Sequence, residues 1–268
     1  KMYCMDREYG GVYWSVASDG TAADAGKHTY AQAFAVYALS SYYEMSKKEE
    51  ALQDARKLFV LIEEKCTDEY GYQESFTRDW KLEKNEKLSE NGLLADKTMN
   101  TILHVLEAYT ELLRVTGDET VKTALEKILE IFRKKVYNEE KQQLDVFFDE
   151  RLHTISDLYS YGHDIEASWL LDRACQVLGQ DEITRQTEDY TQKIAKRVYS
   201  QALNEDGSMN NECFCGKIDN TRVWWVQAEA IVGFYNCYQK TKDEKYKKAV
   251  EDLWNYVKAY MLDQREGA

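Results

Sequence analysis

A histidine and an acidic residue stand close together in residues 160–174, SYGHDIEASWLLDRA, at a spacing that suits proton transfer. His163 precedes Glu166 by three residues, so both side chains would share one face of a helix. A helix N-terminus disfavours a further positive charge, which would keep His163 neutral, the state that a general base needs. Glu166 could then hydrogen-bond the imidazole, select its tautomer and raise its basicity. The pair is suited to removing a proton from carbon.

A second polar stripe lies on an otherwise apolar stretch, residues 96–113, DKTMNTILHVLEAYTELL. Asn100 and His104 stand one helical turn apart on the same face, and Glu107 follows about one turn on. These groups could donate hydrogen bonds to a developing enolate oxygen. The two stripes together suggest chemistry at a carbon next to a carbonyl group.

Each of these features also has a purely structural interpretation. A single histidine near a helix end is commonly a cap or a surface residue, and the polar stripe could be the wet side of a helix. The adjacent Trp224 and Trp225 offer flat apolar surface for a sugar face, and they could equally pack in a core. Gln227 and Glu229 fit a site and a structural role equally well, while His153 in its polar turn is given no role.

Repeated helical hairpins would position these residues. Three segments share a helix, a short turn rich in Gly, Lys and Asp, and a second amphipathic helix, and a weaker copy lies near residue 49. Asp118, Asp181 and Asp243 are the expected N-caps of the second helices. The first helices are apolar nearly all round and belong inside, whereas the second helices carry one apolar stripe and a wide charged face.

The repeat spacing aligns four residues from different hairpins. Asn100, His163 and Trp225 each lie 18 residues before the expected N-cap aspartate of their hairpin, and Tyr30 lies close to the same place in the weakest copy. We expect these four, with His104 one turn below Asn100, to ring one mouth of a barrel. Such a shared phase argues against independent structural roles.

Hairpins with a buried inner helix and an exposed outer helix form either a solenoid or a closed α/α toroid. The connections at 68–97 and 138–162 are long and aromatic, and the second contains the strand-like LDVFFDE. Solenoid links are usually short, and long loops are often functional, so the connections favour the toroid. The fold class predicted from the sequence is therefore all-α.

The composition limits the classes of partner that the protein is expected to bind. The formal net charge is −13 and no Lys/Arg cluster interrupts it, which argues against nucleic acids and anionic membranes and favours a neutral ligand. No apolar run reaches the roughly 20 residues that span a bilayer, so we expect a cytoplasmic protein. The six cysteines lack the spacing of a zinc site or a disulfide scaffold, and Cys213 and Cys215 are interpreted as reduced thiols rather than a metal or redox site.

Four segments, 27–43, 96–113, 160–174 and 221–239, resemble signature segments of the cellobiose 2-epimerases, in the N-acylglucosamine 2-epimerase superfamily. The resemblance runs over the whole chain in order. The motifs SYGHDIEASWL and TMNTILHVLEAYTE separate the cellobiose branch from the acylglucosamine branch.

The resemblance implies an (α/α)6 barrel that acts on the reducing-end glucose of cellobiose and related β-1,4 disaccharides. The sugar ring opens, a histidine removes the C2 proton, a cis-enediolate forms, and a second histidine returns a proton to the other face, without a metal or cofactor. By this resemblance His163 transfers a proton with support from Glu166, and His104 stabilises the intermediate. The remaining residues implied to lie at the site are Asn100 beside His104 and the sugar contacts Tyr30, Trp224 and Trp225.

The sequence departs from the family pattern in its extent. We find about four of six hairpins and expect one barrel domain over residues 1–268, cut at both ends, which leaves an arginine and the second catalytic histidine outside. The 268-residue chain would then have little or no epimerase activity and would expose apolar surface on its inner helices. We expect the intact protein to be a monomer.

Four other functions stay open. The chain could be an N-acylglucosamine 2-epimerase or a mannose isomerase of the same superfamily. Alternatively, an α/α toroid of this kind could be a glycoside hydrolase, which needs two carboxylates flanking a bond, or a sugar-binding protein without turnover. The histidines at the expected mouth disfavour hydrolysis.

Overall fold

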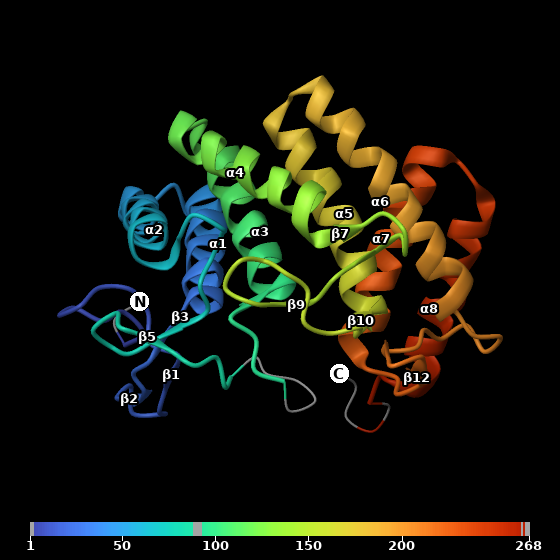
Figure 1. Ribbon diagram of the computed structural model, residues 1–268, viewed down its shortest axis with the longest axis horizontal. Coiled ribbons are helices and arrows are strands. Elements are labelled where there is room, and N and C mark those ends of the chain that lie inside the picture. The colour runs from blue at the N-terminus through green and yellow to red at the C-terminus, as the bar shows by residue number, and fades with distance from the viewer. Residues whose placement is uncertain (1–2, 88–92, 264, 266–268) are drawn as a thin grey trace. The chain divides into compact units, whose positions relative to one another are not determined.

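The computed structural model describes residues 3–87, 93–263 and 265, which form mainly paired helices with short strands between them (Figure 1). In this part of the chain, α2 and α4 each continue into a π-helical turn, η1 (Ile62–Cys66) and η2 (Phe132–Val136). The predicted hairpins are confirmed, including the weak first copy. The hairpins are α1 (Thr29–Ser46) with α2 (Glu49–Leu61), α3 (Met99–Thr116) with α4 (Glu119–Ile131), α5 (Tyr161–Leu178) with α6 (Asp181–Ala202), and α7 (Trp224–Thr241) with α8 (Glu244–Tyr260).

The turns between paired helices follow one local rule. The first helix of each hairpin ends at a residue with left-handed backbone, such as Gly117 at φ 63° and Gly179 at φ 69°. The N–H of that residue bonds back to a carbonyl of the last helical turn. Glycine pays no Cβ penalty in this conformation, which explains its use at two of the four turns.

Two of the three predicted N-caps are correct. Asp118 and Asp243 accept backbone N–H bonds at the starts of α4 and α8. Asp181 is instead the first residue of α6, and Gln180 occupies the cap position without a side-chain cap bond. The acidic Asp181 still suits the first turn, where it faces the positive end of the helix dipole.

Short antiparallel strands line the connections that precede the inner helices. The strand predicted in LDVFFDE is confirmed as β9. The sheets are β1 (Ser15–Val16) with β2 (Ala22–Asp24); β3 (Lys27–His28), β4 (Ser75–Phe76) and β5 (Leu82–Glu83); β6 (Lys97–Thr98) with β9 (Phe147–Phe148); β7 (Tyr137–Asn138) with β8 (Gln143–Leu144); and β10 (Tyr159–Ser160), β11 (Glu212–Phe214) and β12 (Lys217–Asp219).

The chain forms two compact units. Unit 1 comprises residues 1–135 and 147–155, and unit 2 comprises residues 136–146 and 156–268. Within unit 1, α3 packs beside α1, and within unit 2, α5 packs beside α7 (Figure 1). Each unit therefore contains one of the two helices that carry the candidate histidines.

Burial separates the inner helices into two kinds. α3 and α5 are buried over most of their length, as predicted for inner helices. α1 and α7 are less buried, and Phe34 and Tyr37 on α1 and Val232 and Tyr235 on α7 remain exposed. Among the described residues, no helix combines the length and the apolar character needed to cross a membrane.

Candidate active site

In unit 1, His104 lies in a small aromatic and acidic cluster. Its ring centroid lies 5.1 Å from that of Tyr30 in an edge-on contact and 4.7 Å from that of Phe34. Its Nδ1 lies 3.0 Å from Glu107 Oε2, and the residue is only 8% exposed. The structure therefore brings together Tyr30, His104 and Glu107 as the sequence predicts. It adds Phe34, which the sequence analysis missed although it lies one turn after Tyr30.

The Glu107 contact decides the chemistry of the imidazole. Because the carboxylate can only accept, Nδ1 of His104 carries the hydrogen in this contact. The other ring nitrogen, Nε2, then accepts a hydrogen bond when the ring is neutral and donates one when the ring is protonated. His104 can therefore serve either a hydroxyl or a developing oxyanion of a ligand.

Asn100 lies in the first turn of α3, whose start is held by Glu74. The Glu74 carboxylate accepts from the N–H of Thr98 and the hydroxyl of Thr101, each at 2.6 Å. Burial raises the pKa of Glu74 to about 7, against the hydrogen bonds from these two threonines, which lower it. Asn100 Oδ1 is buried and accepts no hydrogen bond within the described residues, which is unusual for a buried polar atom.

His28, which the sequence analysis did not single out, supports the helix that carries Tyr30. It is the N-cap of α1, where its Nδ1 accepts from Tyr30 N at 3.3 Å. Its Nε2 lies 3.2 Å from Asn85 Oδ1 and 3.7 Å from Glu74 Oε2. Burial lowers the pKa of His28 to about 4, so this histidine is neutral at pH 7 and has a structural role.

In unit 2, His163 packs against one of the two candidate tryptophans. The ring centroids of His163 and Trp225 are 4.8 Å apart, and the N–H of His163 donates to Oγ of Ser160, the N-cap of α5, at 3.3 Å. Glu166 is 8% exposed and follows His163 by about one turn on the same helix. Trp224, the first residue of α7, is 73% exposed. The structure thus joins His163 and Trp225 and leaves Trp224 at the surface.

The shared helical position predicted for four residues is wrong for His163. Tyr30, Asn100 and Trp225 are each the second residue of their helices, whereas His163 is the third residue of α5. The position of His163 was predicted by counting back from Asp181, whereas the N-cap of α6 is Gln180, one residue earlier. Gly162 occupies the equivalent position, where an added Cβ would lie 2.7 Å from both Trp225 and Val226.

Asp164 is a site neighbour that the sequence analysis missed. It lies directly after His163, is 1% exposed, and accepts from Leu144 N at 3.1 Å and Arg197 Nη1 at 3.4 Å. Burial raises the pKa of Asp164 to about 7, although Arg197 opposes the shift. The sequence did contain a signal for Asp164, because a charged residue lies between His163 and Glu166 on a helix that is otherwise built for burial.

The structure distinguishes Gln227 from Glu229, whose roles the sequence left open. Gln227 is fully buried and bonds both the N–H and the carbonyl of Met209, at 2.7 and 2.8 Å, so its role is structural. Glu229 accepts from the indole N–H of Trp169 at 2.9 Å, which joins α7 to α5. His153 is paired with Asp149 in an exposed turn, in keeping with the absence of an assigned role.

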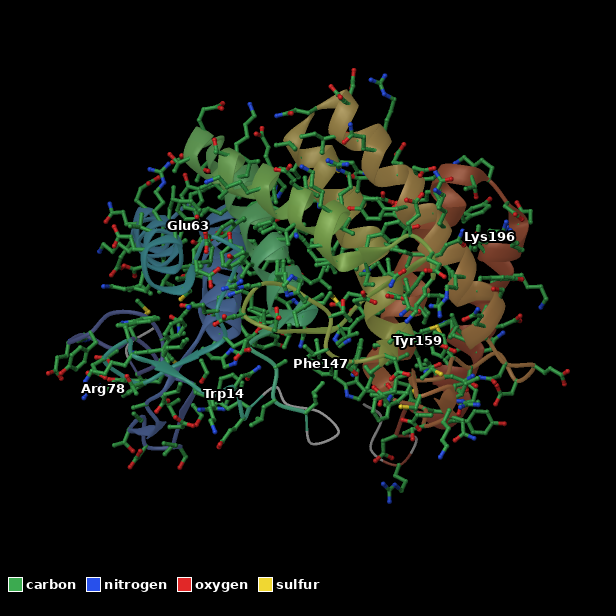
Figure 2. The ribbon with its side chains drawn as sticks, in the orientation of Figure 1. Trp14, Glu63, Arg78, Phe147, Tyr159 and Lys196 are labelled. Atoms are coloured by element: carbon green, nitrogen blue, oxygen red, sulfur yellow. The ribbon has the colours of Figure 1, made fainter. Side chains whose placement is uncertain are left out.

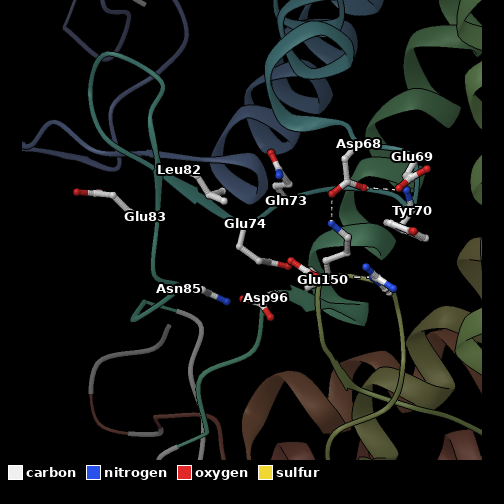
Figure 3. A pocket seen from close by; sticks show the side chains of 12 residues that line it. Asp68, Glu69, Tyr70, Gln73, Glu74, Leu82, Glu83, Asn85, Asp96 and Glu150 are labelled. Atoms are coloured by element: carbon white, nitrogen blue, oxygen red, sulfur yellow. Dashed lines mark hydrogen bonds and ion pairs between the residues drawn. The ribbon is translucent and has the colours of Figure 1, made fainter.

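A polar pocket of about 310 Å³ also lies in unit 1, apart from these candidate residues. Figure 3 shows the lining, in which Asp68 pairs with Lys97 at 2.5 Å. Tyr30, Asn100 and His104 do not line it. Its lining includes Asp68, Gln73, Glu74, Asn85, Asp96 and Lys97.

In the part of the chain that the structure describes, no group of three or more His, Cys, Asp or Glu side chains is arranged to hold a metal ion. Cys213 is buried and Cys215 is exposed, and both are thiols.

Comparison with known proteins defines the class as sugar epimerase with an α/α toroid fold. A solved sugar epimerase from a ruminal bacterium matches with a TM-score of 0.97 and 51% identity, covering 99% of this chain and 68% of that chain. The solved cellobiose 2-epimerase of Bacillus thermoamylovorans matches with a TM-score of 0.95 and 50% identity, covering 99% of this chain and 69% of that chain. The all-α toroid class predicted from the sequence is thereby confirmed.

The family follows from the sequence itself. The model of the N-acylglucosamine 2-epimerase (GlcNAc 2-epimerase) family matches residues 1–268, and the chain belongs to this family. The curated cellobiose 2-epimerase of Ruminococcus albus is 52% identical over 267 residues, which are 100% of this chain and 68% of that protein. The chain thus spans about two thirds of the length of the relatives that it matches.

Proposed function

We propose that this chain carries the 2-epimerase chemistry of a cellobiose 2-epimerase. The reaction is the reversible conversion of the reducing-end glucose of cellobiose, or a related β-1,4 disaccharide, to mannose. The observation that carries the proposal is the 52% identity to a cellobiose 2-epimerase across the whole of this chain. The presence of His163, Glu166, Asn100 and His104 at helix positions that suit such a reaction supports it.

His163 is the proposed base. After the sugar ring opens, its imidazole takes the C2 proton, and the C2–H electron pair enters the C1–C2 bond while the carbonyl oxygen becomes an enediolate oxygen. Its place in the first turn of α5 disfavours a resting positive charge, which keeps the ring ready to accept the proton. Glu166, on the same face of α5, supports the protonated ring. Return of a proton to the opposite face of C2 gives the epimer.

His104 and Asn100 are the proposed stabilisers of the enediolate. His104 is held by Glu107 through Nδ1, so that its protonated ring can donate from Nε2 to the developing negative charge. Asn100 lies about one turn before His104 on α3, and its side-chain amide is the proposed hydrogen-bond partner for a hydroxyl of the same intermediate. Such donors are effective because they are fixed before the reaction and need no reorganisation during it.

The aromatic residues are the proposed sugar contacts. Tyr30 packs on His104, and Trp225 packs on His163, so each aromatic ring adjoins a proposed catalytic histidine. Trp224 is exposed at the start of α7, where its ring can cover a second sugar unit. The proposed partner is a neutral disaccharide, and the reaction requires no cofactor. A monomeric, cytoplasmic protein remains our expectation, which gel filtration and cell fractionation test.

The product of a cellobiose incubation tests the proposal. The natural full-length protein is incubated with cellobiose, lactose, N-acetylglucosamine and mannose in parallel, and the products are identified by NMR. We expect glucosyl-mannose from cellobiose as the main product. Turnover only of N-acetylglucosamine or of mannose would instead favour the sister activities of the family. Release of free glucose would mean hydrolysis, and binding without turnover would mean a sugar-binding protein.

A further inference from the structure

The fourth residue of three inner helices performs the same task. In α1, α5 and α7 this residue is buried and its side-chain oxygen accepts a backbone N–H from the preceding connection. The bonds are Val12 N to Gln32 at 2.7 Å, Leu144 N to Asp164 at 3.1 Å, and Met209 N to Gln227 at 2.7 Å. A neutral amide performs the task in α1 and α7, whereas α5 uses a carboxylic acid.

The acid in α5 is the costlier choice. Removing a carboxylate from water is unfavourable unless a cation and hydrogen bonds compensate, and glutamine avoids that cost in the two other helices. Asp164 is compensated by Arg197 of α6, which is itself largely buried. An amide suffices for the backbone bond in α1 and α7, so the feature that distinguishes Asp164 is its pairing with Arg197.

Arg197 in turn holds the residue pair that precedes the helix. Its guanidinium carbon lies 4.3 Å from the ring centroid of Tyr159. Tyr159, labelled in Figure 2, is the first residue of β10. The next residue, Ser160, caps α5 by accepting from the N–H of His163. Asp164, Arg197 and Tyr159, here called the brace, therefore fix the junction of β10 and α5 from both sides of His163.

We propose that the brace is a positioning device for His163 and that Asp164 and Arg197 are positioning residues of the proton transfer. The inference rests on the proposed function, since it concerns the base of that reaction. The brace touches no reacting atom. It holds the first turn of α5 so that the imidazole meets C2 in one orientation, and small displacements of a base are costly in rate.

Two brace variants and one matched control test this role in the natural full-length protein. D164N keeps the acceptor for Leu144 N and places an amide N–H₂ group opposite Arg197. R197K keeps the charge and loses the planar stack on Tyr159. The control is D172N, which alters another buried carboxylate of α5, about 12 Å further along the helix, paired with Lys240 at 2.9 Å.

Steady-state kinetics with cellobiose give the first readout. We expect kcat to fall about 10- to 100-fold in D164N and about 5-fold in R197K, with KM within about twofold in both. D172N should lower the melting temperature and leave kcat within about twofold. Equal losses of kcat in D164N and D172N would overturn the proposal, because the effect would then follow from stability alone.

The imidazole of His163 gives a second readout that does not depend on turnover. Its ¹⁵N chemical shifts should move in D164N and R197K and stay in place in D172N. Unchanged His163 shifts in both brace variants would also overturn the brace. A wild-type protein that fails to turn over cellobiose would contradict the proposed function instead, while the chemical shifts would still decide whether the brace orients His163.

Discussion

The two histidine helices, α3 in unit 1 and α5 in unit 2, carry the same short pattern at different depths. His104 precedes Glu107, and His163 precedes Glu166, by three residues in each case. His163 lies in the first turn of its helix, whereas His104 lies in the second turn and bonds its glutamate directly. The shallow histidine feels the positive end of the helix dipole and suits a base, and the deeper one is fixed as a hydrogen-bond partner.

The two helices are also anchored differently. The start of α3 is held from outside by Glu74, which accepts from Thr98 and Thr101. The start of α5 is held from within by Asp164, which depends on Arg197. Burial raises the pKa of both acids to about 7. The same chain therefore stabilises a polar, buried helix start in two ways. At α3 neutral threonine donors bond a carboxyl group, and at α5 an ion pair holds it.

The largest expected effect separates the two histidines. His163→Asn should lower kcat for cellobiose epimerisation about 10²- to 10⁴-fold, because the general base is lost. The matched control is His153→Asn, which alters an exposed histidine paired with Asp149 and should leave kcat unchanged. Retention of near wild-type kcat in His163→Asn would show that the shallow histidine is not the base.

The contribution of Glu74, which holds the start of α3, to the free energy of unfolding should depend on pH. The folded pKa of Glu74, about 7, lies above the ordinary value of 4.5, so the folded state binds this proton more tightly than the unfolded state. Stability from this group is therefore greatest below pH 4.5 and is lost as pH rises towards 7. Glu74→Gln removes that loss, and its free energy of unfolding relative to wild type should rise by about 3 kcal/mol between pH 4.5 and 7.5.

Denaturant unfolding of both proteins at a series of pH values gives this difference. Other titrating groups cancel because wild type and variant share them. A difference that stays constant with pH would mean that Glu74 titrates normally, and the parallel with Asp164 would fail.

Gly162 offers a way to disturb α5 without touching a charge. In Gly162→Ala the new Cβ would lie 2.7 Å from Trp225, so the tryptophan that packs on His163 must move. We expect a loss of about 1–3 kcal/mol in stability from overpacking and a weaker apparent affinity for cellobiose. Gly179→Ala is the control, since nothing lies within 4 Å of its Cβ and only its left-handed φ of 69° is strained. Equal KM values in the two variants would contradict a role for Trp225 in binding.

The smallest effect concerns the pairing of the deeper histidine. Glu107→Gln keeps the size of the side chain and removes the charge that faces Nδ1 of His104. We expect kcat to fall about tenfold, which corresponds to about 1.4 kcal/mol, because the protonated ring loses its charged partner. The measurement is kcat as a function of pH for Glu107→Gln and wild type. Identical pH profiles of kcat would mean that Glu107 is only a structural partner of His104.

The sequence predicted the hairpins because their signals are local. Turn glycines, cap aspartates and amphipathic spacing lie within a few residues of the structure that they specify. The same locality misled at Asp181, where consecutive polar residues Gln180, Asp181 and Glu182 made the cap ambiguous by one position. That shift sufficed to misplace His163 relative to the other aligned residues.

The sequence predicted the candidate site residues themselves, but it did not predict the buried acids that hold the helices carrying them. Glu74 and Asp164 act through partners 24 and 33 residues away in sequence, and no local pattern specifies such contacts. One signal was nevertheless present, since Gln32, Asp164 and Gln227 occupy the same helical position in three hairpins. A polar residue repeated at a buried position predicts a conserved task even when its partner is unknown.

Hydrogen exchange at C2 of the sugar shows whether His163 is the base of the reaction. Cellobiose is incubated in D₂O with the wild-type protein and with His163→Asn, and the reducing-end C2 proton is followed by NMR. We expect deuterium at C2 together with a new mannose anomeric signal for the wild type, and neither for His163→Asn. Exchange at the wild-type rate in His163→Asn would contradict the assignment of the base, and epimer without any deuterium at C2 would contradict the proton-transfer mechanism itself.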